Sequence, residues 1–205
     1  MTTRAFFAAA LLGLGFPGVA GAADFSDPTW PCIQRKVERL SVGLMWPRPI
    51  PEDMPQDPAL RDAVEGLGAK LAVRRIEPET LKPDIAAFAE SHGGDADLLG
   101  HVFQQVFDSL SQRRARIIDG IAEFSLSQIA LSERIEAARQ EMDAEMAKAD
   151  PDFDKVDALE EQIDWDQTIH TDRQQSITYL CETPTLLEKR LYSIAQLLQA
   201  EIEGS

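Results

Sequence analysis

The chain has 205 residues, of which 35 are acidic and 20 basic, so its formal net charge at pH 7 is −15. A surface this negative repels nucleic acid phosphates and anionic lipid head groups, so neither is an expected partner. The length is that of one ordinary domain with a core of its own.

The first 22 residues have the three-part layout of a secretory signal peptide. Arg4 precedes an apolar run over residues 5–16, Pro17 and Gly18 break the run, and Ala20-Gly21-Ala22 matches an Ala-x-Ala cleavage site. The apolar run is shorter than the ~20 residues that span a bilayer. We therefore expect cleavage near Ala22, a periplasmic or secreted mature chain and no stable membrane insertion. An uncleaved N-terminal anchor is the alternative.

The chain has two cysteines, Cys32 and Cys181. In an oxidising compartment such a pair is expected to form a structural disulfide. The spacing does not fit a CxxC redox pair, a haem attachment or a zinc site, since each of these needs closely spaced or additional ligands. Two separately buried thiols are the alternative, because free cysteine packs as a small apolar residue.

Residues 23–58 are expected to form an N-terminal helix followed by a proline-rich wrap. One face of the helix would be apolar, because steps of 3, 4 and 3 separate Trp30, Ile33, Val37 and Leu40. Five prolines between positions 47 and 58 then exclude a helix or a central strand. Trp46 and Ile50 predict that this stretch packs on the protein's own core. A polyproline-like ligand for another protein is the alternative.

Two short helices are expected to open the helical domain of residues 59–205. Asp57 can cap the first and Pro58 suits its first position, and apolar residues at 60, 64, 67 and 71 continue it to about Arg75. The second contains Ile85 and Phe88 and ends at Gly93-Gly94.

Two long helical arms are expected next, over about 95–150 and 153–203. Apolar residues follow a 3-4 repeat from Phe103 to Met142 without an intervening proline, and the repeat resumes from Val156 to Leu198 after a turn at Pro151. Pro184 is expected to kink or restart the second arm. No strand pattern is visible. The predicted fold class is therefore all-α: a long antiparallel helical hairpin, coiled-coil-like, packed at its open end against short N-terminal helices.

Two groups of residues are weak candidates for metal binding. The first is His92, Asp95, Asp97 and His101, which lie within ten positions. The alternative is local structure: the glycines between them end one helix, and Asp95 or Asp97 caps the next.

The second group is Asp166 and His170, which are four positions apart on one helical face and suit a metal or an oriented base. Together with Arg173 they occupy core-type positions of the second arm, and antiparallel pairing would place Gln128 and Glu133 nearby. A buried polar layer that fixes the register of the hairpin is the alternative interpretation.

The sequence carries no recognised catalytic or cofactor motif. Nucleophile-elbow, zincin and phosphate-loop patterns are missing, and so is the paired Glu-x-x-His pattern of di-iron bundles. We therefore expect a protein that is not an enzyme and uses no cofactor.

The acidity is concentrated in residues 123–172, which hold 15 carboxylates and 4 basic residues. A two-helix arm has one protected seam, so most of these carboxylates must face water. They either form an ordinary solvated face or attract a protein partner with a basic surface. The candidates for such a binding face are Glu133, Glu136, Glu141, Asp157, Glu160 and Asp164.

Two functional hypotheses follow. The first is an envelope scaffold, adaptor or chaperone-like interaction protein; in outline the chain resembles periplasmic helical proteins of the Spy and CpxP type, which are exported, small and built from long antiparallel helices. Their Leu-Thr-x-x-Gln motif is missing, the closest string being Leu110-Ser111-Gln112-Arg113-Arg114, so no functional residue carries over. The second hypothesis is a cation-binding or metal-sensing periplasmic module, for which no EF-hand loop is present.

Overall fold

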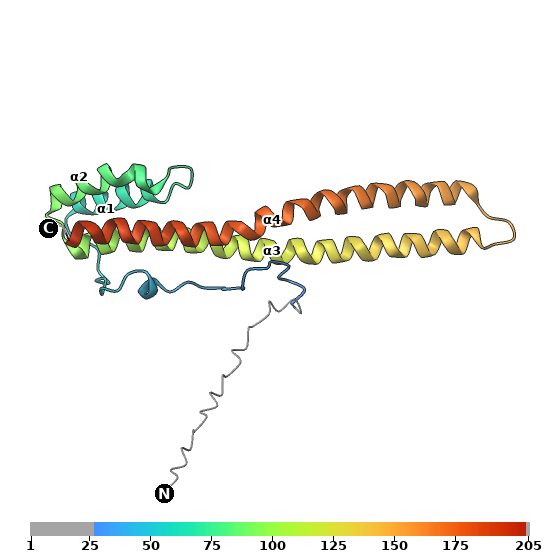
Figure 1. The fold of residues 1–205 in the computed structure, drawn as a ribbon, viewed down its shortest axis with the longest axis horizontal. Coiled ribbons are helices and arrows are strands. Elements are labelled where there is room, and N and C mark those ends of the chain that lie inside the picture. The colour runs from blue at the N-terminus through green and yellow to red at the C-terminus, as the bar shows by residue number, and fades with distance from the viewer. Residues whose placement is uncertain (1–26, 204–205) are drawn as a thin grey trace, which may run out of the picture.

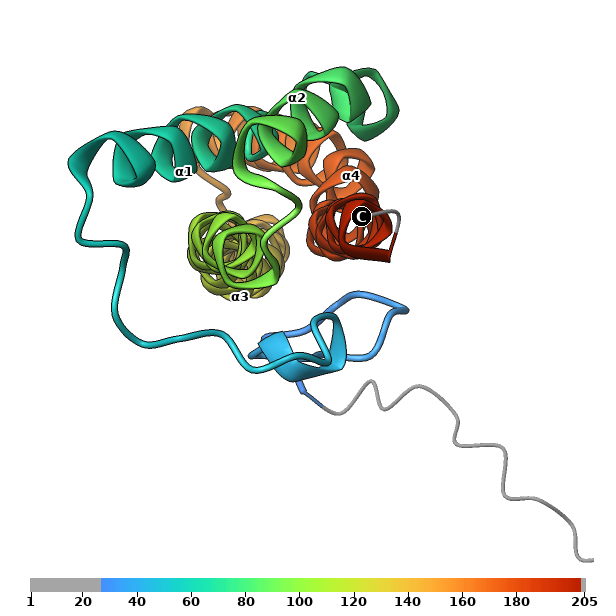
Figure 2. The ribbon, with the colours of Figure 1, turned by 90° about the vertical axis from the view of Figure 1, so that its left-hand side faces the viewer.

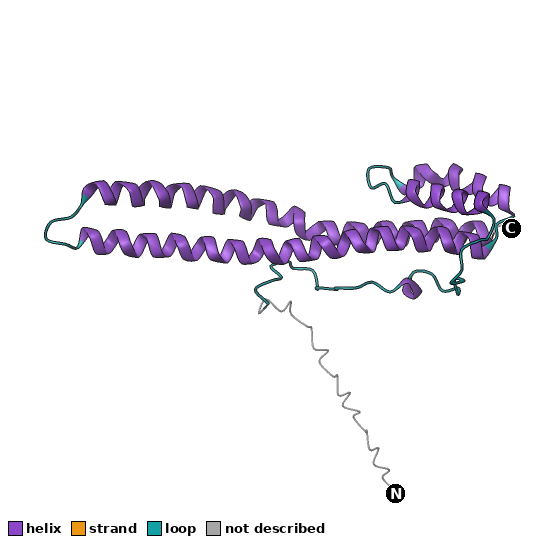
Figure 3. Ribbon diagram, turned by 180° about the vertical axis from the view of Figure 1, so that it is seen from behind, coloured by secondary structure: helices purple, strands orange, loops and turns teal. Residues whose placement is uncertain are grey.

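The computed structural model describes residues 27–203, and this part of the chain is helical without any strand (Figure 3). Its elements are the short 3-10 helices η1 (Val42–Leu44) and η2 (Pro78–Leu81) and the α-helices α1 (Pro58–Leu71), α2 (Lys82–His92), α3 (Ala96–Met146) and α4 (Phe153–Glu203). The expected signal peptide lies outside the described residues. None of the described helices combines the length and apolar character needed to cross a membrane.

Helices α3 and α4 form the predicted antiparallel hairpin (Figure 1). Each has 51 residues, which corresponds to about 75 Å at 1.5 Å per residue. Their 3-4 repeats face each other, and apolar side chains are buried between the arms in clusters at the open end, halfway along the hairpin and near the turn. Near the turn this seam consists of Leu131, Ile135, Ala138, Leu159 and Ile163.

The main core lies at the open end of the hairpin, where the structure has three layers. Helices α1 and α2 lie on one side of the α3–α4 pair and the N-terminal segment lies on the other (Figure 2). The largest fully buried side chains of this core include Trp46, Leu71, Ile85, Phe103, Leu191 and Leu198. The prediction of a hairpin packed against short N-terminal helices is confirmed.

The proline-rich stretch packs on its own chain, as Trp46 and Ile50 predicted. Trp46 is 2% exposed and stacks on Phe103 of α3, with 5.2 Å between ring centroids. Ile50 lies against Gly100, where an added Cβ would come within 3.3 Å of the Ile50 side chain. The absence of a side chain at position 100 therefore lets the stretch approach the α3 backbone closely.

The predicted helix around residues 30–40 is wrong; apart from turns, this segment is extended along the hairpin. The Asp27 carboxylate accepts a hydrogen bond from the Thr29 backbone N–H and so forms a tight turn. The Ser125 hydroxyl of α3 donates to the Pro28 carbonyl at 2.6 Å. Because backbone groups of the segment bond to α3, its apolar side chains do not share one buried face: Trp30 is buried, whereas Ile33 is 79% exposed.

One helix boundary also differs from expectation, and of the two outcomes expected at Pro184, a kink or a restart, the restart is not seen. Helix α1 ends at Leu71 instead of near Arg75, because the guanidinium of Arg190 on α4 donates to the Leu71 carbonyl at 2.6 and 3.1 Å. Helix α4 runs through Pro184 without a restart. Proline cannot donate an N–H to the preceding turn, and Figure 1 shows a lateral step in α4 near its middle.

The predicted disulfide is confirmed. Cys32 and Cys181 are bonded, with 5.4 Å between their Cα atoms and 149 positions between them in sequence. Trp30, Ile118 and Ile121 pack with the two cysteines in a small apolar cluster halfway along the hairpin. The bridge therefore attaches the extended N-terminal segment to α4.

We expect Cys32→Ser to lower the melting temperature without changing the helix content at room temperature. The helices do not depend on the bridge, but opening a loop of 149 positions restores unfolded-state entropy equivalent to about 5 kcal/mol in the chain-entropy model. Circular dichroism melts measure the effect. The matched control is Cys181→Ser, which should lower the melting temperature equally, and the double variant should lower it no further. Two freely alkylated thiols in native protein would contradict the account.

Candidate interaction surface on the hairpin

The half of the hairpin nearest the turn, residues 123–172, is here named the distal arm. It consists of α3, α4 and their connection, without α1 or α2 against it (Figures 1 and 3). It holds 15 of the 35 acidic residues of the chain but 4 of the 20 basic ones. A two-helix arm of this charge offers an elongated acidic surface to solvent.

A polar layer interrupts the apolar seam of the distal arm. Asp166, 3% exposed, accepts a hydrogen bond at 2.7 Å from Nε of Arg134 and a second bond from the same guanidinium. This contact raises the pKa of Arg134. Gln128 donates to the backbone carbonyl of His170 at 3.1 Å. These contacts between the arms fit the interpretation of a layer that fixes their register.

The polar layer differs in detail from the sequence-based expectation. The partner of Asp166 is Arg134, one position from the expected Glu133. Glu133 and Arg173 are exposed, so neither belongs to the layer. His170 contributes its backbone carbonyl. A heptad-type pattern predicts which faces meet but not the register to one residue, and this explains the shift.

A buried carboxylate closes the turn between the arms. Glu145, 3% exposed, accepts hydrogen bonds from Nζ of Lys148 at 2.8 and 2.9 Å and from the Asp152 backbone N–H at 3.3 Å. Lys155 of α4 contacts Glu145 at 3.3 Å and Glu141 at 2.7 Å. The hydrogen bonds from Lys148, followed by those from Asp152 and Lys155, lower the pKa of Glu145. Glu145 was not among the residues predicted from the sequence to have a role.

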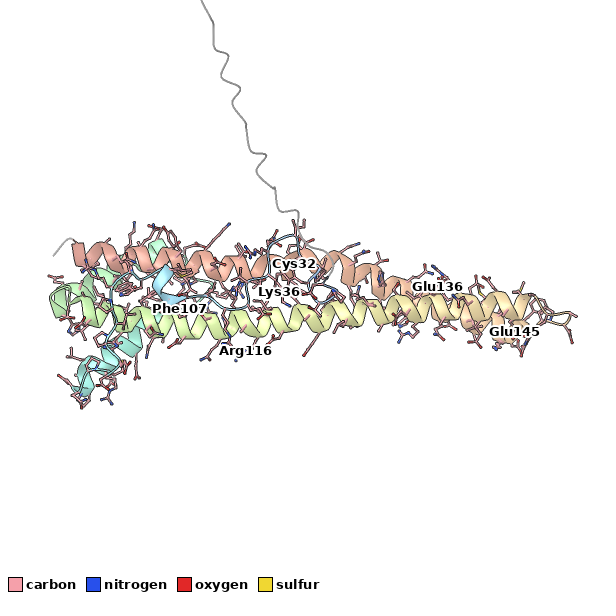
Figure 4. The ribbon with its side chains drawn as sticks, turned by 90° about the horizontal axis from the view of Figure 1, so that it is seen from below. Cys32, Lys36, Phe107, Arg116, Glu136 and Glu145 are labelled. Atoms are coloured by element: carbon pink, nitrogen blue, oxygen red, sulfur yellow. A yellow bond between two sulfur atoms is a disulfide. The ribbon has the colours of Figure 1, made fainter. Side chains whose placement is uncertain are left out.

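The six candidates for an acidic binding face are all exposed, but they are not equivalent. Glu141 is paired with Lys155, and Glu136 accepts a hydrogen bond from Gln140. Glu133 lies on α3, and Figure 4 shows Glu136 and Glu145 on the distal part of the same helix. The three on α4 come together along one shallow groove, which is lined by Asp157, Glu160, Glu161, Asp164 and Trp165 together with small or polar neighbours.

The groove on α4 contains two residues that sequence analysis did not single out, Glu161 and Trp165. Trp165 is 68% exposed. A signal for it was present, because Trp165 falls between the core positions Ile163 and Asp166 and so had to point away from α3. A large aromatic residue off the apolar repeat is a better marker of a contact surface than the carboxylates around it.

The metal-binding candidates between His92 and His101 do not form a common site, and some of them have local structural roles. Asp95 caps α3 by accepting hydrogen bonds from the N–H groups of Asp97 and Leu98. Gly93, with a φ of 70°, ends α2. The ring of His92 packs on Phe88, Asp97 is exposed and His101 is buried. Within residues 27–203, no three His, Cys, Asp or Glu side chains form a group that could hold a metal ion.

The comparisons with protein-family models, with curated proteins and with solved structures give no match for this chain. The likeness in outline to periplasmic helical proteins therefore rests on the architecture alone.

We expect acid to loosen the turn between the arms through Glu145. Because its pKa lies below the ordinary value of 4.5, ionised Glu145 stabilises the folded turn above that value. The contribution is lost as the pH falls through the folded-state pKa. Protection of amides against hydrogen exchange in residues 141–156 should therefore decrease between about pH 6 and about pH 3.

The variant Glu145→Gln should show low protection at both pH values. The matched control is Glu136→Gln, which changes an exposed carboxylate on the same helix and should behave as the unaltered protein does. If Glu145→Gln kept the original pH dependence, the assignment to Glu145 would be incorrect.

Proposed function

We propose that this protein is an exported, non-catalytic helical scaffold or adaptor whose distal arm binds a protein partner with a basic surface. The observation that carries the proposal is the groove on α4, where exposed carboxylates surround the exposed indole of Trp165. The long hairpin would hold this groove away from the main core, where a partner can reach it.

The carboxylates of the groove are not neutralised by the protein's own cations. Within the described residues, the side chains of Asp157, Glu160 and Asp164 form no ion pair or hydrogen bond. In contrast, three of the four cations of the distal arm pair with other carboxylates of that arm. A partner that presents lysine or arginine would be attracted at a distance, and its cation can also stack on Trp165.

Export is part of the proposal. Its support is the signal-peptide layout of residues 1–22 and the disulfide, which is compatible with an oxidising compartment. We expect the mature chain to start at Ala23, as measured by intact mass on material from the cell envelope. Met1 retained on that material would contradict the proposed export.

The binding role is tested by removing charge from the groove while keeping its shape. The variant Asp157→Asn/Glu160→Gln/Asp164→Asn should lose most of its binding to a lysine-rich helical peptide at low salt, because the attraction is electrostatic. Isothermal titration calorimetry measures the binding, and capture from envelope extract then identifies natural partners. Extending the substitutions to Glu133, Glu136 and Glu141 measures how much the carboxylates on α3 add to peptide binding.

The matched control is Glu52→Gln/Glu65→Gln/Glu90→Gln, which removes three exposed carboxylates outside the distal arm. It should bind the peptide as the unaltered protein does. Equal binding and equal salt dependence for both variants would mean that the acidic groove serves solubility only.

The alternative of a cation-binding module has no comparable geometric support, since Asp95 is engaged as a helix cap and Asp166 is paired with Arg134. Calorimetric titration with Ca²⁺ and Zn²⁺ separates the two functions. Heat from stoichiometric metal binding would favour the alternative.

A further inference from the structure

A second groove, between the end of α1 and α3, is lined by three arginines. Arg74 and Arg75 follow α1, Arg113 lies on α3, and small apolar side chains from Ala69, Ala72 and Val73 line the groove with them. All three arginines are exposed. In the described part of the chain, none of them forms an ion pair or a side-chain hydrogen bond.

Within the described residues, these three arginines form no ion pair, although the chain has 35 acidic residues. Carboxylates are available close by, since Lys70, one turn before Arg74, pairs with Asp84 at 2.6 Å. The carbonyl groups at the C-terminal end of α1 do not require these arginines, because Arg190 already donates to the Leu71 carbonyl. Burial lowers the pKa of Arg190, the nearby Glu77 carboxylate opposes this shift, and Arg74 adds to it.

The complement of this groove is present on the same chain. We name Asp157, Glu160, Glu161 and Asp164 the acidic strip; they stand at positions i, i+3, i+4 and i+7 of α4 and so share one face. Trp165 lies beside them. Carboxylates pair with guanidinium groups in two-point contacts, and the alanine and valine side chains offer an apolar surface to the indole.

The acidic strip cannot reach the arginine groove of its own chain. The Arg134–Asp166 pair sets the register of the arms, and it places Asp164 level with about residue 136 of α3. Arg113 is then about 35 Å away along the same helix, at 1.5 Å per residue. Figure 4 shows Arg116 near the middle of α3 and Glu136 farther along the same helix, toward the turn.

We propose that two copies of this chain associate antiparallel, so that the acidic strip of each lies in the arginine groove of the other. A two-fold axis makes the two contacts equivalent. Figures 1 and 2 place α1 and the distal part of α4 on the same side of α3, as one continuous interface requires. Repulsion between the net charges is screened beyond about 8 Å at 0.15 M salt, whereas paired groups in contact are screened much less. The inference rests on the proposed function, because it names a partner for the acidic groove.

The test exchanges the charges of the two surfaces. The groove variant is Arg74→Glu/Arg75→Glu/Arg113→Glu and the strip variant is Asp157→Lys/Glu160→Lys/Asp164→Lys. In sedimentation equilibrium at 0.15 M salt, the unaltered chain should dimerise with rising concentration and each variant alone should remain monomeric. An equimolar mixture of the variants should dimerise again, because both contacts then join opposite charges. At about 1 M salt, where screening acts within 3 Å, the dimer should be lost.

The matched control is Arg35→Glu/Arg39→Glu/Arg48→Glu, which reverses three exposed arginines of the N-terminal segment and should dimerise as the unaltered chain does. Circular dichroism verifies folding. If a reversed variant does not fold, its neutral counterpart with glutamine or asparagine replaces it and should weaken association at least tenfold.

The inference is overturned if the unaltered chain stays monomeric up to about 100 μM, a concentration well above the micromolar Kd of an ordinary weak interface. It is also overturned if the mixture of variants remains monomeric. Binding of the lysine-rich peptide is measured on the groove variant, which is expected to be monomeric and keeps an unoccupied acidic strip. Peptide binding by this variant, with an unaltered chain that stays monomeric, would refute the dimer alone. Dimerisation of the unaltered chain, with no peptide binding by this variant, would refute the broader adaptor role.

Discussion

The apolar seam between α3 and α4 is the interaction on which the rest of the structure depends. Helix α1 packs on α3, helix α2 packs on α4, and the N-terminal segment contacts both arms. Each fully buried leucine or isoleucine contributes about 1.5–3 kcal/mol relative to exposure, and the seam repeats such residues along both arms. Without it, α1, α2 and the N-terminal segment would lose the surface of the hairpin on which they pack.

Charged side chains attach the remaining segments to this hairpin by binding backbone carbonyls. Arg114 of α3 donates to the Val37 carbonyl at 2.6 Å, and Arg190 of α4 donates to carbonyls at the end of α1. A buried guanidinium is costly unless its donors are satisfied. These arginines therefore stabilise one arrangement of the loops around the hairpin. Apart from the bond between Ser125, at the inner end of the distal arm, and the Pro28 carbonyl, the described residues show no such attachment to this arm, which leaves its carboxylates and Trp165 open to contact by another protein.

Much of the fold could be predicted from local chemistry. The long 3-4 repeats, the proline at the turn, the Asp57-Pro58 start and the glycine pair after α2 each act within a few residues, and the structure contains all four features. The errors come from contacts between distant positions. The segment after Trp30 has helical spacing, but its Val37 carbonyl accepts a hydrogen bond from Arg114 of α3, 77 positions away. Helix α1 ends early because of Arg190, which lies 119 positions from Leu71.

The candidate surface was also predictable in part, because some of its features depend on local sequence and others on contacts between distant positions. The concentration of charge in residues 123–172 required exposed carboxylates, and the structure has them. Which carboxylates remain unpaired depends on the register of the arms, and the sequence pattern does not determine that register to one residue. The exposure of Trp165 followed from its place off the repeat, whereas the arginine groove requires α1 and α3 to be brought together in three dimensions.

The central claim is that the distal arm stands out from the core as an extended two-helix rod. Small-angle X-ray scattering of the mature chain, diluted in high salt to keep it monomeric, tests this most directly. The account predicts a maximum dimension of at least about 75 Å, the length of one arm, and a radius of gyration well above that of a compact domain. A radius of gyration of about 16 Å, as expected for a compact chain of roughly 180 residues, would contradict it.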